Sequence, residues 1–124
     1  MKPMRVTLPW PGKLLSPNAR AHYMTVARAK KKFKEASWAL TKQAGLVIPA
    51  DARPQVQLTF YPPTVRRRDE DNLVAMMKSL LDGVALACGC DDSQWHLKEP
   101  IVAGHIGGYV VVEFTLEEPA NGAA

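Results

Sequence analysis

The alternation of hydrophobic and polar residues predicts several strands. Residues 5–8 and 56–60 alternate with period two, which is typical of strands with one buried face. A further strand is expected near residues 96–103, and a last one over residues 109–116. The Gly107-Gly108 turn between them predicts that these final strands form an antiparallel hairpin.

Two intervening segments have apolar residues every three or four positions, which predicts helices. The first helix is expected to run from Thr25, a residue type that favours helix N-caps, to Gly45, which favours helix C-termini. The second is expected over residues 71–87. Its apolar face comprises Leu73, Met77, Leu80, Leu81 and Val84, and its opposite polar face comprises Asp71, Ala75, Lys78 and Asp82.

The predicted element order is β-α-β-α-β-β, which favours an α+β fold with one mixed sheet and two helices packed against it. A chain of 124 residues fits one domain, expected over residues 1–116, with residues 117–124 as a flexible C-terminal tail. No apolar stretch approaches the ~18–20 residues that would span a bilayer. We therefore expect a cytoplasmic protein with no membrane partner.

The charge is distributed unevenly along the chain. Residues 1–50 hold ten lysines and arginines against one acid, whereas the remaining residues hold six against eleven acids. A basic half beside an acidic half suits a phosphate-binding surface around a carboxylate metal site. A solvated helix face followed by an acidic tail would give the same distribution, so charge alone leaves both interpretations open.

A charged motif lies at the junction between a predicted strand and the second helix. Arg66, Arg67 and Arg68 lead directly into Asp69, Glu70 and Asp71. In extended backbone, Asp69 and Asp71 point to the same side, and their repulsion favours a bound cation such as Mg²⁺. Alternatively, Asp71 caps the helix and the neighbouring acids favour its positive N-terminal end.

Two further features bear on this motif. Asp91-Asp92 follows the second helix; alone it is typical of a turn, but with Asp69 and Asp71 it outlines a metal-dependent phosphodiesterase site. Lys78 lies on the polar helix face, where it would either stabilise charge at a substrate phosphate or form a surface pair with Asp82.

The remaining candidates for chemistry are weaker. Cys88 and Cys90 are too close in sequence for an unstrained disulfide, so we expect free thiols; a zinc site with His96 is the alternative. The histidines are scattered and are expected to be structural or surface residues: His22, His96 and His105. The tryptophans are expected to make core or dimer contacts rather than stack on bases: Trp10, Trp38 and Trp95.

In their order along the chain, these segments resemble the RusA-type Holliday-junction resolvases of bacteria and their prophages. The resemblance rests on residues 68–73 (Arg-Asp-Glu-Asp-Asn-Leu), residues 78–84 and residues 91–94 (Asp-Asp-Ser-Gln). The opening residues 8–11, with Asn18 soon after, are also similar to the family's N-terminal signature. The resemblance covers nearly the whole chain.

The resemblance implies a RusA-like fold and a homodimeric, Mg²⁺-dependent endonuclease that resolves four-way DNA junctions by paired nicks, in DNA recombination and repair. By motif, it assigns Mg²⁺ binding to Asp69, Asp71 and Asp92. It also assigns a catalytic lysine to Lys78, although this lysine lies nearer the Asp-Asn pair in the type member. The side chains expected to hold the DNA backbone are Arg28, Lys30, Lys31, Lys32, Lys34, Arg66, Arg67 and Arg68.

Two questions remain open at this point. A helix over residues 71–87 would be ~24 Å long, whereas the return to Asp92 spans at most ~18 Å, so Asp92 reaches Asp69 either by a nearly straight return or from a dimer partner. We favour the same chain. The alternatives to a nuclease are a non-catalytic DNA-binding module, and an interaction or structural protein whose acids are only helix caps.

Overall fold

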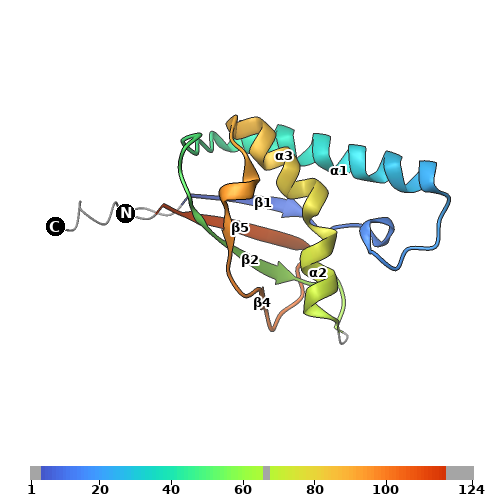
Figure 1. Ribbon diagram of the computed structural model, residues 1–124. Helices are drawn as coiled ribbons and strands as arrows, with labels where there is room; N and C mark the ends of the chain where they lie inside the picture. Colours follow the sequence, from blue (N-terminus) through green and yellow to red (C-terminus); the bar gives the residue numbers. More distant parts are fainter. Residues whose placement is uncertain (1–3, 66–67, 117–124) are drawn as a thin grey trace.

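The computed structural model of the protein describes residues 4–65 and 68–116. One sheet is covered on one side by three helices (Figure 1), so the α+β class with a mixed sheet is confirmed, with one helix more than expected. The elements are β1 (Met4–Pro9), a 3₁₀ turn η1 (Lys13–Leu15), α1 (Tyr23–Ala44), β2 (Gln55–Tyr61), α2 (Glu70–Met76), α3 (Lys78–Cys88), a 3₁₀ turn η2 (Asp92–Gln94), β3 (His96–Leu97), β4 (Ile101–Val102) and β5 (Tyr109–Thr115).

Some expectations cannot be compared with this structure. Arg66, Arg67 and the expected tail over residues 117–124 lie outside the described residues. Within the described part of the chain, no helix combines the length and the apolar character needed to cross a membrane.

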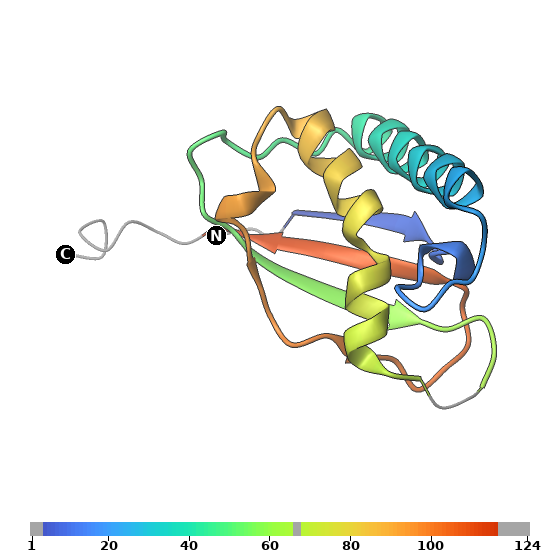
Figure 2. The ribbon, with the colours of Figure 1, turned by 45° about the vertical axis from the view of Figure 1, so that its right-hand side comes forward.

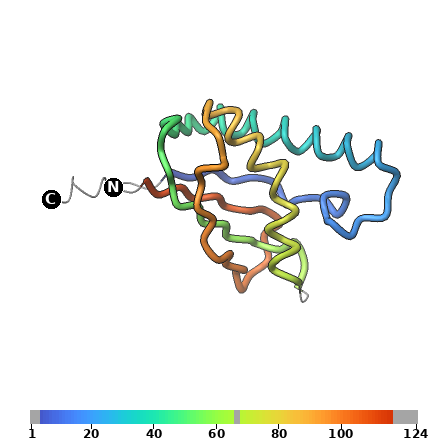
Figure 3. The backbone as a smooth tube through the Cα atoms, in the orientation of Figure 1, coloured from blue at the N-terminus to red at the C-terminus, as the bar shows by residue number. Residues whose placement is uncertain are grey.

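The sheet places β5 between β1 and β2, with antiparallel pairing on both sides. β3 and β4 pair in parallel with β2 on its other edge (Figure 3), so they form one interrupted strand. Pro100 falls in the gap between them, where its lack of an N–H suits a break in the ladder. The predicted hairpin of the last two strands is wrong, because β2 lies between β4 and β5.

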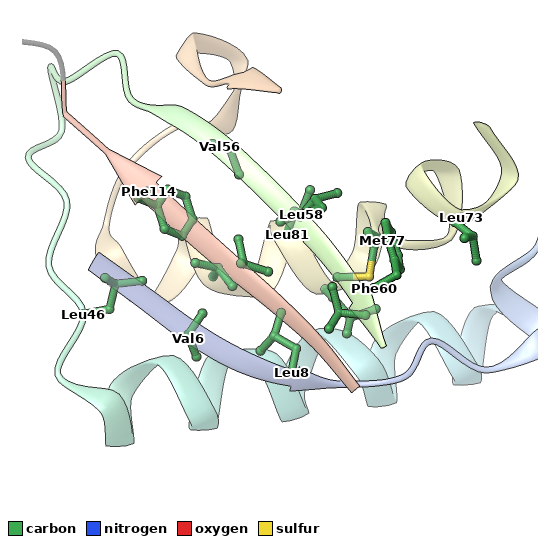
Figure 4. Packing of buried hydrophobic residues seen from close by; sticks show 14 of the residues in the cluster. Val6, Leu8, Leu46, Val56, Leu58, Phe60, Leu73, Met77, Leu81 and Phe114 are labelled. Atoms are coloured by element: carbon green, nitrogen blue, oxygen red, sulfur yellow. The ribbon is translucent and has the colours of Figure 1, made fainter. Parts of the chain in front are cut away.

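The core lies between the sheet and the helices. Along β2, Val56, Leu58 and Phe60 are fully buried and alternate with half-exposed residues, as the period of two predicts. They pack against apolar side chains of the helical segment, including Met77, at the junction of α2 and α3, and Leu81 of α3 (Figure 4). Each such side chain contributes about 1.5–3 kcal/mol by leaving water.

Helix α1 starts earlier than expected because His22, rather than Thr25, is its N-cap. The Nδ1 atom of His22 accepts a hydrogen bond from the Met24 amide at 3.2 Å. The helix ends before Gly45, as predicted, and this glycine adopts the left-handed conformation with φ of 69°. Figure 2 shows α1 beside α3, on the same side of the sheet.

The predicted second helix is observed as two helices that meet at Met77, where φ is −85° and ψ is −5°. Met77 is fully buried, and the break keeps Leu73 before it and Leu80 after it in the core. The first described helical residue is Glu70, one position before the expected start.

Candidate functional site

Two adjoining hollows lie between α2–α3 and the loop that follows β1. The first has a volume of about 610 Å³, and its polar lining includes Lys13, Arg68, Asp69 and Asn72. The second has a volume of about 390 Å³, and its polar lining includes Lys30, Lys78, Ser79 and Asp82. Because both hollows share Ser16 and Met76, we treat them as one groove, the α2 groove.

The polar face predicted for the second helix lies along this groove except for Asp71, which lines neither hollow. Ala75, Lys78 and Asp82 line the same hollow, although the helix is broken at Met77. Lys30 of α1 faces them across the hollow, and this side chain was expected to contact DNA. The α2 groove therefore brings basic residues of the N-terminal half next to acids of the C-terminal half.

Asp92 comes to the end of this polar face. Helix α3 ends at Gly89, whose φ of 71° is a left-handed conformation that lets the chain reverse direction. The carboxyl groups of Asp92 and Asp82 then lie within hydrogen-bonding reach, with Lys78 nearby. We call these three residues the Asp82–Asp92 cluster.

The electrostatic environment of Asp92 follows from this contact. Partial burial raises the pKa of Asp92, and the hydrogen bond and the charge of Asp82 raise it further, whereas Lys78 acts in the opposite direction. Two carboxyl groups held together by different segments repel when both are ionised, and a cation relieves that repulsion. The sequence analysis did not assign Asp82 to the site, although its place on the polar face was the available signal.

Asp69 has a structural role that the sequence analysis gave to Asp71. Its Oδ1 atom accepts hydrogen bonds from the backbone amides of Asp71 at 2.9 Å and Asn72 at 3.3 Å, so Asp69 is the N-cap of α2. Asp71 is exposed in the first helical turn. The alternative that an aspartate caps this helix is therefore confirmed, but the capping residue is Asp69 rather than Asp71.

The predicted metal ligands are not all brought together in the single chain. Asp71 lies in the first turn of α2, whereas Asp82 lies in α3 beyond the break at Met77, and Asp92 comes close to Asp82. Among the residues that the structure describes, there is no group of three or more His, Cys, Asp or Glu side chains placed to hold a metal ion. The chain thus presents two separate acidic positions, one at each end of the α2 groove.

We expect Asp69→Ala to lower the free energy of unfolding by about 1 kcal/mol, because two amides of α2 lose their acceptor. Asp69→Ser removes the carboxylate but keeps a capping oxygen, so its stability should stay close to that of the wild type. Urea denaturation of both variants measures the difference. Equal losses of stability in the two variants would show that the capping hydrogen bonds are not what Asp69 contributes.

The other acid of the later pair behaves as the turn interpretation predicted. Asp91 caps η2, with its Oδ1 accepting a hydrogen bond from the Ser93 amide at 3.0 Å. This hydrogen bond lowers the pKa of Asp91. The two neighbouring aspartates therefore have different environments, since Asp92 faces Asp82 while Asp91 holds the backbone.

The basic residues predicted to contact DNA do not share one surface. Lys30 faces the α2 groove, whereas Lys31 and Lys34 line a separate hollow. At ~100° per residue, Arg28 and Lys32 lie on yet another side of α1. The Arg68 guanidinium lies 5.4 Å from the Trp10 ring centroid and donates two hydrogen bonds to Thr64, at 2.9 and 2.8 Å.

The remaining candidates have mainly structural contacts. His22 caps α1, and His105 packs against the ring of Tyr61. Cys88 and Cys90 are free thiols. Burial, followed by the proximity of Cys90, raises the pKa of Cys88 to about 11, so this thiol stays protonated at neutral pH.

Comparisons with known proteins place the chain in a family without naming its activity. No protein-family model matches it. A protein of Xylella fastidiosa (strain Temecula1 / ATCC 700964), described as "Uncharacterized protein", is 36% identical in an alignment of 124 positions that covers 94% of this chain and 80% of the other protein. The chain belongs to the same family as this Xylella protein.

Proposed function

We propose that the protein is a Mg²⁺-dependent, structure-selective DNA endonuclease of the RusA type, which resolves four-way junctions by paired nicks. The observation that carries this proposal is the meeting of Asp92, Asp82 and Lys78 at one end of the α2 groove. A groove with acids at both ends and cations between them is suited to a phosphodiester backbone beside a metal ion.

The carboxylates of the Asp82–Asp92 cluster fit Mg²⁺ by their chemistry. Mg²⁺ prefers oxygen ligands and is often held by one or two protein carboxylates together with substrate phosphate oxygens. Asp82 and Asp92 would hold the ion, which would supply neutralisation of charge at the scissile phosphate and activation of the attacking water. The two carboxyl groups already lie side by side in the chain, which supports this assignment.

Cationic side chains of the groove would contact the DNA phosphates. Lys78, next to the two carboxyl groups, would stabilise the negative charge that develops on the phosphate during cleavage. Lys13, Lys30 and Arg68 line the same groove and would hold the DNA backbone without reading its bases. Recognition by shape rather than by sequence follows from such contacts.

A complete site would also need Asp69, which lines the other end of the groove, and Asp71, which lies next to it in the first turn of α2. We propose that a homodimer joins the two acidic positions, so that Asp69 and Asp71 of one chain face the Asp82–Asp92 cluster of the other. A two-fold dimer would also match the near two-fold symmetry of a four-way junction. This replaces our sequence-based preference for a site within one chain.

The proposal is tested by incubating the protein with a synthetic four-way junction and Mg²⁺. We expect paired nicks in the junction, about 100-fold less nicking when EDTA removes the metal, and little nicking of a linear duplex of the same sequence. Binding of the junction is measured in parallel by gel shift. A protein that binds the junction but leaves it intact with Mg²⁺ would contradict the nuclease.

One observation favours a second function, a non-catalytic DNA-binding module with the same fold. The described part of a single chain assembles no three-ligand metal group. The variant Asp71→Asn separates the two functions: an enzyme keeps or tightens junction binding while losing cleavage, whereas a binding module has no cleavage to lose. A purely structural protein, whose acids only cap helices, would show the same melting temperature with and without Mg²⁺.

A further inference from the structure

Helix α1 carries an exposed stripe of cationic and aromatic side chains outside the α2 groove. Lys31, Lys34, Trp38 and Lys42 follow one another at intervals of three or four residues, so they share one helix face. We call these four residues the Trp38 stripe. Lys31 and Lys34 line a hollow of about 300 Å³ together with Trp38, Glu35 and Leu86.

Trp38 is exposed to an extent that a structural role within the chain does not explain. Of the expected core or dimer contact, the core contact is wrong, because the Trp38 side chain is 41% exposed and the neighbouring Leu86 of α3 is 60% exposed. The Lys42 ammonium lies 6.0 Å from the Trp38 ring centroid, so a cation is already held over this ring. The indole is thus an accessible flat surface with positive charges on both sides along the helix.

We propose that the Trp38 stripe binds single-stranded DNA, with one base stacked on Trp38 and the flanking phosphates paired with its lysines. An aromatic platform in a basic groove is the arrangement that proteins use for single strands of any sequence, because every base has a π-face. Lys34 and Lys42 are separated by about 12 Å along the helix axis, with Trp38 between them. A stretch of strand therefore contacts both lysines while a base reaches the ring.

The stripe favours a nucleic acid over an acidic protein segment. An acidic protein segment would pair with the same lysines. An apolar side chain of that segment, however, would have to enter the hollow beside the Glu35 carboxylate, which repels an acidic segment. A base that stacks on the indole needs no deep cavity; it takes the place of the Lys42 ammonium over the ring, and this ammonium then pairs with a flanking phosphate. This inference goes beyond the proposed nuclease, because it concerns a separate surface and requires neither metal nor cleavage.

The test measures binding of two fluorescein-labelled strands of equal length in EDTA. One is a 12-residue thymidine oligonucleotide, and the other is an abasic strand that keeps the phosphates but lacks the bases. We expect Trp38→Ala to weaken binding of the thymidine strand about tenfold and to leave the abasic strand unchanged. Trp38→Phe should keep most of the affinity, since it retains a ring.

The lysines give a second readout. Lys34→Ala and Lys42→Ala should each reduce the slope of log K against log salt by about 0.7, for both strands. Tyr23→Ala serves as the matched control, because Tyr23 is an aromatic residue of the same helix that is 75% exposed and lies about 22 Å along the helix axis from Trp38. That variant should bind both strands as the wild type does.

Three results would overturn the inference. The wild type binds no thymidine strand; Trp38→Ala weakens both strands equally; or a peptide of glutamates around one leucine binds more tightly than the strand and depends on Trp38. These results are independent of junction cleavage. If the protein nicks junctions but gives one of these three results, only the proposal for the Trp38 stripe is contradicted. If it binds the strands as expected but never nicks a junction, only the proposed nuclease function is contradicted.

Discussion

Replacing Gly83 by alanine is expected to lower the free energy of unfolding by about 3 kcal/mol or more, or to prevent folding. A Cβ atom at Gly83 would overlap the Ser37 hydroxyl and the backbone carbonyl oxygen of Lys34, both on α1. The carbonyl cannot rotate away, because it belongs to the helix, so α1 and α3 would have to separate. Both helices cover the core, and their separation would expose it.

Helix propensity predicts a change in stability of the opposite sign. Alanine is favoured over glycine by about 1 kcal/mol in the middle of a helix, so propensity alone predicts that Gly83→Ala is stabilising. The control is Gly104→Ala, where an added Cβ meets no atom within 4 Å. Urea denaturation compares the three proteins. A Gly83→Ala variant as stable as the wild type would show that the helices do not pack as closely as described.

The second large effect concerns the division of the proposed site between two chains. Asp71→Asn and Asp92→Asn should each reduce junction nicking by about 100-fold or more, because each removes a carboxylate from the metal site. If the site joins two chains, mixing the variants restores activity. A heterodimer has one site with both changes and one site with neither.

The expected recovery is limited and has a distinctive product. Random exchange makes about half of the dimers mixed, each with one intact site, so about a quarter of the wild-type sites return. A single intact site gives one nick per junction rather than two, which a denaturing gel resolves. Asp51→Asn, at an exposed loop position, is the control and should cut normally. If mixing restores no nicking activity, the four acids of a site belong to one chain: Asp69, Asp71, Asp82 and Asp92.

The parts of the fold that the sequence predicted well are those with local causes. The period of β2 and the glycine after α1 depend on neighbouring residues, and both predictions agree with the structure. The start of α1 was missed because it depends on the side chain of His22 accepting a hydrogen bond. The final hairpin was wrong because a Gly-Gly turn shows where the chain bends but not which strand lies next to it.

The same distinction applies to the candidate site. Helical spacing placed Lys78 and Asp82 on one face, and the structure confirms that they line one hollow. The contact between Asp82 and Asp92 depends on how the chain reverses after Gly89, and no local pattern gives that path. The expectation of a core contact for Trp38 is wrong, because its side chain is 41% exposed in the single chain, whereas the alternative of a dimer contact stays a prediction.

The position of β5 also determines when the protein becomes able to fold during synthesis. This strand follows the other described strands in the sequence, yet it lies in the middle of the sheet and is the partner of both β1 and β2. Until the ribosome has released residues 109–115, β1 has no neighbour within the sheet and β2 lacks its longest one. The nascent chain must therefore keep β1 unpaired and one edge of β2 uncovered until β5 has been made, a period in which both strands are exposed to association with other chains.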